Sequence, residues 1–279
     1  MTVHSGPPDP PTAGSSPAAE DALQQAVELR NRRLAHAGVA RAEDVLMKRY
    51  GLTSRQEAFG LMRQASQRFN IKMQTLADVA VRLPAPSGNA ARPPAAAVRG
   101  NAPQLSALLS ANGTPPATHG AVLKAALHHT LEITGTAMGN VQLVENGMLR
   151  IDKHTGLNRH FTDYFAFIET STTSCAQAAE ESRQVTVKDV AASETFDEGS
   201  RHAILQAGSQ ACHSVPLLSP RGAVVGMISS HHEQPLQDLS AAQLTQLHQL
   251  GQQVGRWLTW HRNTAVVDAL HHLHATATG

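Results

Sequence analysis

Proline is distributed very unevenly along this chain, and its distribution limits where folded domains can lie. Of the 15 prolines, five fall within the first 17 residues and seven lie between Pro84 and Pro116. Both segments are rich in small residues and hold few large apolar side chains, so little can offset the entropy of ordering them. We therefore expect a disordered arm over 1–19 and a Pro/Ala-rich linker over 84–118, which leave two folded segments, 20–83 and 119–279.

Composition excludes several classes of protein. No run of about 18 apolar residues is present, so no transmembrane helix is expected. The first 19 residues lack the basic start and apolar core of a secretory signal, and two cysteines cannot build a disulfide framework. These features predict a cytoplasmic protein without a membrane partner.

The first folded segment has helical periodicity throughout. Gly51 is expected to end a long helix, a Thr-x-x-Gln capping box from Thr53 to Gln56 opens a second one, and Asn70 ends it. A third helix follows before Pro84. The predicted helices run over residues 21–50, 53–70 and 73–83.

The second folded segment alternates between strand and helix patterns. Asn146-Gly147 between two apolar runs is a strong hairpin signal, and a second hairpin is expected around Gly222. Helices are predicted at 119–134, near 175–181 and 198–207, and from Ser240 to about Leu273. The fold class is therefore multidomain: a helical N-terminal part, then an α+β antiparallel sheet with flanking helices.

Charge differs between the two segments. Residues 21–83 hold eleven Lys/Arg against six Asp/Glu, whereas residues 117–279 hold ten against fourteen. Such an asymmetry indicates that the first segment meets a polyanion, although chance variation between two small domains would also produce it.

The pattern Ala42-Glu-Asp-Val-Leu-Met-Lys-Arg-Tyr-Gly51, followed by Glu57-Ala-Phe59, Asn70-Ile-Lys72 and Leu76-Ala77, resembles the ANTAR domain over about 45 residues. That family is a three-helix RNA-binding module of bacterial transcription antiterminators. Its usual Lys-Gly pair is replaced here by Glu43-Asp44, which exchanges a positive group for two negative ones.

The second segment resembles a GAF sensor domain of the kind joined to ANTAR domains in actinobacteria. The resemblance is carried by Asn140-Val-Gln-Leu, Phe161-x-x-Tyr-Phe165, Ser174-Cys-Ala, Val185-x-Val-Lys-Asp189 and His213-Ser-Val-Pro-Leu-Leu with Gly226-Met-Ile-Ser-Ser-His231. The family usually has Cys-Gly where this chain has Cys175-Ala176. Together the two resemblances imply a signal-responsive antitermination regulator in which a sensor domain controls binding to paired stem-loops of nascent RNA.

Basic side chains around the three helices are the expected RNA contacts, because RNA phosphates bind cations spaced along a face. Arg49 and Lys72 lie beside helix ends, where a long side chain can reach a phosphate. The alternatives are a solvated helix surface and a DNA-binding transcription factor. The candidate RNA-binding residues are Lys48, Arg49, Tyr50, Arg63, Arg68 and Lys72.

The sensor resemblance implies a pocket for an unidentified small molecule, with haem held by a histidine as one alternative. Sixteen histidines invite a metal hypothesis, but no set has suitable ligand spacing, and none is predicted. No motif for hydrolysis or nucleotide chemistry is present, so we expect no enzyme; the alternative is a methionine-sulfoxide-type reductase using Cys175 or Cys212. The candidate pocket residues are Phe161, Tyr164, Phe165, Cys175, Phe196, His213 and Ser229.

A homodimer is expected as the means of coupling. A loose, polar heptad in the first helix is too weak to hold a coiled coil alone, so the last helix is expected to supply the missing contact. The heptad comprises Leu23, Val27, Arg30, Leu34, Ala37 and Arg41, and the apolar face of the last helix comprises Leu247, Leu250, Val254, Trp257 and Leu258.

Overall fold

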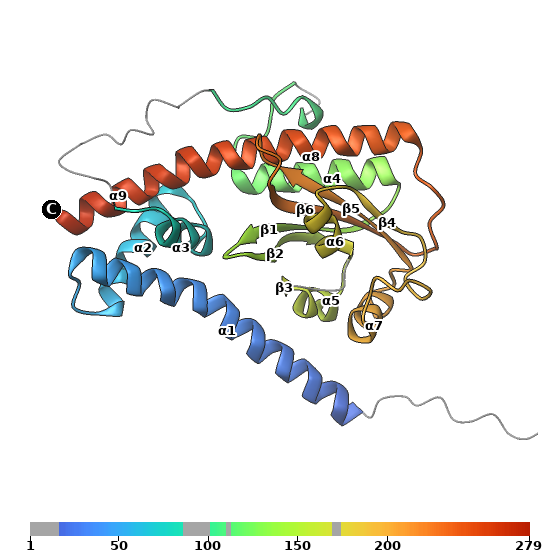
Figure 1. The fold of residues 1–279 in the computed structure, drawn as a ribbon, viewed down its shortest axis with the longest axis horizontal. Coiled ribbons are helices and arrows are strands. Elements are labelled where there is room, and N and C mark those ends of the chain that lie inside the picture. The colour runs from blue at the N-terminus through green and yellow to red at the C-terminus, as the bar shows by residue number, and fades with distance from the viewer. Residues whose placement is uncertain (1–16, 86–100, 110–112, 169–173) are drawn as a thin grey trace, which may run out of the picture.

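The structure, a computed structural model, describes residues 17–85, 101–109, 113–168 and 174–279, so most of the arm and much of the linker expected from sequence lie outside the described residues. The N-terminal segment consists of three helices, which we call the helical module (Figure 1). They are α1 (Pro17–Tyr50), α2 (Arg55–Phe69) and α3 (Met73–Arg82).

The ends of α2 follow from local side-chain chemistry. Asn70 ends the helix in the left-handed conformation at φ 51°, as the sequence predicts. The start differs from the prediction by one residue: Ser54 is the N-cap, and its side chain accepts a hydrogen bond from the Glu57 amide. Glu57 in turn accepts from the amide and hydroxyl of Thr53. Glu57 takes the role predicted for Gln56 because it is the third residue after the N-cap Ser54, and its carboxylate in the first turn also complements the helix dipole.

The second segment forms a six-stranded antiparallel sheet in the order β3-β2-β1-β6-β5-β4. We call this sheet and the helices that pack on it the sheet domain. Asn146 and Gly147 both have positive φ and form the predicted β1–β2 turn. The strands are β1 (Met138–Glu145), β2 (Met148–Thr155), β3 (Phe167–Ile168), β4 (Val185–Val187), β5 (Ala211–Leu218) and β6 (Val224–His232).

Helices cover both faces of the sheet (Figure 1). The helices α4 (His119–Thr134) and α8 (Ala241–His261) lie on one face, and α5 (Arg159–Tyr164), α6 (Ser174–Glu181) and α7 (Glu198–Gln206) lie on the other. Gly255 lets α8 approach β5 closely, since a Cβ there would lie 2.3 Å from the backbone N and O of Leu218. The central strands β1, β5 and β6 are therefore buried on both faces, whereas β2 is only partly covered.

A short 3₁₀ turn of the linker, Ser106–Leu108, docks on the face formed by α4 and α8. Leu105 and Leu108 are buried there, and the amide of Ala107 donates to Gln253 of α8 over 3.1 Å. This part of the linker is consequently integrated into the sheet domain.

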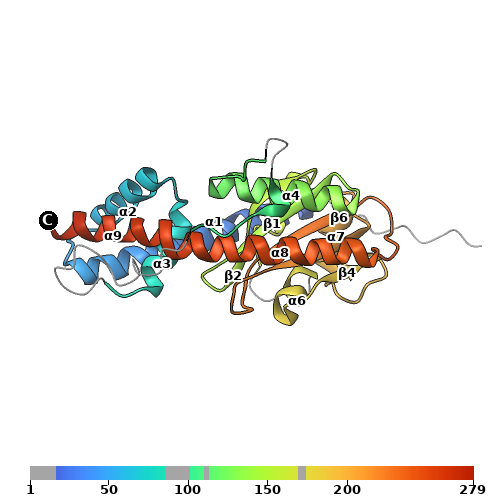
Figure 2. The same cartoon turned by 90° about the horizontal axis from the view of Figure 1, so that it is seen from above.

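The last helix crosses from the sheet domain into the helical module. After α8, a π-helical turn over Arg262–Val266 leads into α9 (Val267–Thr278), and Figure 2 shows the three as one nearly straight rod. The α9 residues Ala269, Leu270 and Leu273 are buried in one cluster with Leu46 and Met62 of the helical module. The helical module thus completes its core with a helix from the far end of the chain.

No helix in the described ranges has both the length and the apolar character needed to cross a membrane.

Candidate functional site

The sheet face beneath α5, α6 and α7 carries polar side chains at its centre. The antiparallel register places Asn140 of β1 opposite Ser229 of β6, Ser229 opposite Ser214 of β5, and Ser214 opposite Val185 of β4. Because directly paired residues point to the same side of a sheet, these four side chains form one row across four strands. Cys175 of α6 lies over this row, with its sulfur 3.1 Å from the Ser229 hydroxyl.

Several polar atoms on this face have no hydrogen-bond partner among the described residues. Both amide atoms of Gln142, Oδ1 of Asn140 and Nε2 of His231 are buried and unpaired, although Gln142 and Asn140 are only 1% and 2% exposed. Buried polar groups are nearly always hydrogen-bonded, and each unmet group costs about 1–3 kcal/mol. These atoms are therefore available to hydrogen-bond an ordered water or a bound molecule.

His231 is held in a neutral state on the same face. Its Nδ1 lies 3.0 Å from the Ser209 hydroxyl, and its ring meets Phe161 edge-on with centroids 4.9 Å apart. Complete burial, with a smaller contribution from His232, lowers the pKa of His231 to about 3. The face therefore carries hydrogen-bonding groups and no charge from this histidine.

The structure brings six of the seven predicted pocket residues to this face and separates His213 from them. Phe161 of α5 and Phe165, which follows the helix, have rings tilted by 50° with centroids 4.7 Å apart, and both share one core with Phe196 and Cys175. His213 is the neighbour of Ser214 in β5, so its side chain points to the opposite face of the sheet. There its Nδ1 lies 2.8 Å from the Thr186 hydroxyl and its Nε2 lies 2.8 Å from the Gln184 amide oxygen. The remaining two predicted residues on the covered face are Tyr164 and Ser229.

Sequence reasoning missed Asn140, Gln142, Ser214 and His231. The alternation of Asn140 and Gln142 with apolar Val141 and Leu143 is a signal that could have found them. Alternation alone, however, usually indicates a solvent-exposed face.

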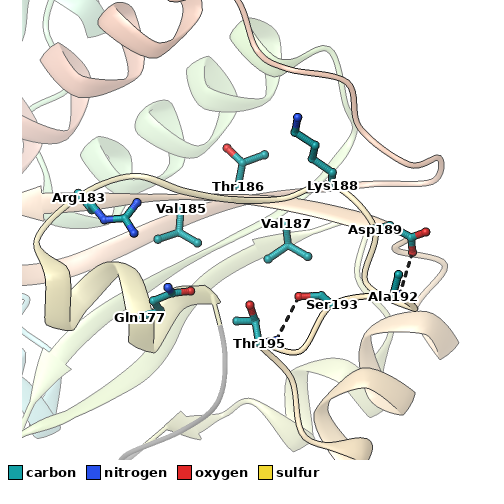
Figure 3. A pocket seen from close by; sticks show the side chains of 10 residues that line it. All are labelled: Gln177, Arg183, Val185, Thr186, Val187, Lys188, Asp189, Ala192, Ser193 and Thr195. Carbon is teal, nitrogen blue, oxygen red and sulfur yellow. Dashed lines mark hydrogen bonds between the residues drawn. The ribbon is translucent and has the colours of Figure 1, made fainter.

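A pocket of about 420 Å³ opens at the β4 edge of the same layer. Figure 3 shows Gln177 of α6 on one side, Ser193 and Thr195 of the following loop on the other, and Val185 and Val187 of β4 between them. Since both valines also belong to the core that contains Cys175, the pocket adjoins the polar row at its β4 end.

Both cysteines are buried, and neither forms a disulfide. Within the described ranges, no group of three or more His, Cys, Asp or Glu side chains is placed to hold a metal ion.

The helix α5 connects the covered face to the helical module. Its inner side presents Phe161 to the core, whereas Asp163 on its outer side meets α1. The Asp163 carboxylate accepts from Gln24 over 2.9 Å, and its carbonyl accepts from Asn31 over 2.6 Å. The helix α5 therefore contacts both the core of the covered face and α1.

Three of the predicted RNA-binding residues have partners inside the chain. The guanidinium of Arg49 donates to the carbonyls of Ala80 and Leu83 and so closes the end of α3. Lys72 forms an ion pair of 2.7 Å with the buried carboxylate of Asp152 in β2. The Tyr50 hydroxyl lies 3.1 Å from Nδ1 of His274 in α9, and burial raises the pKa of Tyr50.

The other three predicted residues, Lys48, Arg63 and Arg68, are exposed and have no ion pair or hydrogen bond to another described residue. Phe59, which was not among the predicted contacts, lies one turn before Arg63 on α2 and is 39% exposed. Phe59 is adjacent in sequence to the buried Ala58 and so lies about 100° around the helix from it, at the edge of the buried face. Phe59 and Arg63 are therefore both available to a partner.

Glu43 and Asp44, which replace the usual Lys-Gly pair, both contact Arg55 at the start of α2, over 3.2 and 2.6 Å. The replacement therefore supplies an ion-pair network that connects α1 to α2.

Comparison with known proteins identifies both segments. A model of the GAF domain matches residues 117–259, and a model of the ANTAR domain matches residues 21–79. No curated protein matches the chain.

Solved structures with a similar fold include the GAF domain/HD domain protein from Geobacter sulfurreducens, at 13% identity and a TM-score of 0.45, covering 53% of this chain and 97% of that one. A free methionine-R-sulfoxide reductase from Neisseria meningitidis has 18% identity and a TM-score of 0.40, covering 52% and 81%. The GAF domain from Acinetobacter phosphoenolpyruvate-protein phosphotransferase has 14% identity and a TM-score of 0.39, covering 81% and 98%.

The domain content is regulatory: the sheet domain is a GAF sensor domain and the helical module is an ANTAR domain, and the chain belongs to the GAF domain family as a regulator that combines the two.

Proposed function

We propose that this protein is a signal-responsive regulator that binds stem-loop RNA through its helical module and prevents transcription termination. In this proposal the sheet domain binds a small molecule and controls RNA binding, and the protein acts on nascent RNA in the cytoplasm without catalysing a reaction. The observation that carries the proposal is the exposed, unpartnered pair of Phe59 and Arg63 on the outer face of α2.

The chemistry of that pair suits an RNA loop. Unpaired bases of a loop stack on aromatic rings, and cations alongside bind the phosphates. Arg68 lies in the last turn of the same helix and Lys48 in the last turn of α1, so further cations flank the ring. A protein that recognises duplex DNA would instead need a helix that fits the major groove.

Two connections support control by the sheet domain. The first is the contact between Asp163 of α5 and α1, and the second is the rod from α8 into α9. π-Helical turns occur frequently at functional sites, and this one lies where the rod passes between the two cores. At that turn, Arg262 donates to the carbonyl of Val144 at the end of β1 over 3.0 Å.

The test is a salt titration of binding to a two-hairpin RNA, with duplex DNA of the same sequence as competitor. Phe59→Ala should weaken RNA binding by about 1–3 kcal/mol through lost base stacking. Arg63→Ala should lower the slope of log affinity against log salt by about 0.7 to 0.9, as expected for one phosphate contact.

Matched controls are Leu205→Ala, an equally exposed apolar residue of α7, and Arg33→Ala, an exposed cation of α1. Equal effects of the control and test variants, with helix content intact, would contradict the assignment. Tighter binding to the DNA duplex would favour a DNA-binding transcription factor.

We also propose that the protein acts as a homodimer, because each chain has one helical module whereas the proposed RNA target has two stem-loops. The predicted contact face of the last helix is buried within the same chain, so a dimer would use another surface. The residues concerned are Leu247, Leu250, Val254, Trp257 and Leu258. Sedimentation that detects only monomer at micromolar concentration, with and without RNA, would refute the dimer.

A further inference from the structure

We propose that the covered face of the sheet domain binds a small, flat, uncharged molecule that both donates and accepts hydrogen bonds, such as a heterocyclic carboxamide or a free nucleobase. This inference rests on the proposed sensor role and specifies the chemical class of the signal. It also assigns Gln142 and Asn140 as the residues that recognise the molecule.

The buried atoms without hydrogen-bond partners determine which donor and acceptor groups the molecule must carry. Gln142 Oε1 and Asn140 Oδ1 are acceptors without donors, and Gln142 Nε2 is a donor without an acceptor. A side-chain amide pairs in a bidentate manner with a group that presents an adjacent donor and acceptor, as Gln and Asn do with adenine. Carboxamides, lactams and amino-heterocycles have this arrangement.

The charges around the face favour a neutral molecule. The polar row consists of the neutral side chains of Asn140, Ser229 and Ser214, and burial keeps His231 uncharged at neutral pH. A carboxylate or phosphate buried beside Asn140 would have no counter-charge within this row, which is far more costly than burying a hydrogen-bonded neutral group.

Two of the three cations near the pocket entrance are paired with carboxylates. Arg183 pairs with Glu181, and Lys188 pairs with Asp238 over 2.7 Å. Arg201 of α7 donates to two carbonyls of the preceding loop, which leaves its charge uncompensated, and its buried Nε has no partner among the described residues. An anion would therefore meet Arg201 on α7 and no cation in the polar row itself.

Aromatic side chains provide the walls for a flat ring. Phe161, Phe165 and Phe196 all belong to the core above the polar row, and Phe161 already meets the His231 ring edge-on. Binding sites for small molecules typically combine such apolar walls with a few polar groups that fix orientation.

The pocket at the β4 edge opens on the same sheet face as the amides. Its wall residue Val185 ends the row that runs through Ser214 and Ser229 to Asn140. Adjacent strands lie about 4.8 Å apart, so three strand spacings separate the pocket from Asn140 by about 14 Å. The pocket and the unmet amide groups therefore lie at two ends of one polar row.

The experiment uses the full chain and two matched pairs of probes: nicotinamide against nicotinate, and adenine against adenosine 3′,5′-cyclic monophosphate. A neutral probe at a hundredfold excess over its Kd should raise the Tm by about 5 °C, whereas its anionic counterpart should not. Equal shifts from the anionic probes, or no shift from either neutral probe at millimolar concentration, would overturn the proposal.

Gln142→Met keeps the length of the side chain and removes both amide atoms, so it should abolish the shift. Gln237→Met, an exposed position of the same domain, should retain it. If Gln142→Met fails to fold, NMR of the unmodified protein decides the question. The side-chain amide resonances of Gln142 should shift when the neutral probe is added. Unchanged resonances at saturation would refute the role of Gln142.

RNA binding is measured separately in the same samples. Loss of the probe response with intact RNA binding would overturn only the class of ligand. A probe response without RNA binding would overturn the proposed function and leave the ligand assignment standing.

Discussion

Replacing Gln142 by Met should stabilise the ligand-free protein, which is unusual for a change at the centre of a core. Gln142 is 1% exposed, and neither of its amide atoms has a partner among the described residues. Methionine has a similar length and is flexible enough to fill the same space next to Met227, its neighbour across the strands. The substitution therefore removes two unmet polar atoms with little loss of packing.

The size of the effect follows from the cost of burying unpaired groups. Each unmet polar group costs about 1–3 kcal/mol, and imperfect packing of the new thioether offsets part of the gain. We expect the free energy of unfolding to rise by about 2 kcal/mol. For a domain of this size, that corresponds to a Tm increase of about 4–8 °C.

Urea unfolding followed by far-UV circular dichroism measures this directly, and Gln184→Met is the matched control. The Gln184 amide donates to the Leu244 carbonyl over 2.9 Å and meets His213 Nε2 over 2.8 Å. The same chemical change there should lower stability by about 1–3 kcal/mol, since it removes two hydrogen bonds. If both variants are destabilised alike, the reasoning about unmet atoms at Gln142 is wrong.

Three further outcomes follow from the structure. Burial lowers the pKa of His231 to about 3, so between pH 6.5 and 3 the folded protein binds fewer protons than the unfolded chain. The free energy of unfolding should therefore fall by up to about 1.4 kcal/mol per pH unit as the pH drops through this window. Unfolding measured at pH 7.5, 6 and 5 should depend less steeply on pH for His231→Asn than for the unmodified protein. Gly255→Ala should destabilise by about 3 kcal/mol or more, because its Cβ would lie 2.3 Å from the Leu218 backbone; an unchanged urea midpoint would contradict this. Asp163→Ala removes the carboxylate that accepts from Gln24, so amide hydrogen exchange in the first half of α1 should accelerate about fivefold, while exchange in α8 serves as the unchanged reference.

Local sequence determined the elements whose signals are short-range. Asn146-Gly147 specifies the β1–β2 turn because both residues adopt positive φ, and Asn70 ends α2 for the same reason. Periodicity was sufficient to place α4 at His119–Thr134, since its apolar stripe and its Thr118 cap agree. These features depend only on neighbours within a few residues.

The covered polar face could be recognised only from the tertiary structure. In the sequence, Asn140 and Gln142 alternate with Val141 and Leu143, which is the pattern of a strand with one side in water. Helices α5 to α7 bury that side, and no local signal states that a later segment will cover it. Likewise, neighbouring residues of a strand point to opposite faces of the sheet, so Ser214 belongs to the covered polar face and His213 to the other face.

Long-range contacts also decided which basic residues are available and where the helical module ends. The sequence favours Arg49 and Lys72 over Arg63 as RNA contacts because both lie beside helix ends, but the end of α3 engages Arg49 and the buried Asp152 engages Lys72. The core of the helical module includes Leu270 from α9, about 200 residues further along the chain. Periodicity shows that a helix has an apolar face, but the partner of that face depends on how the whole chain folds, and for this reason only the tertiary structure could show it.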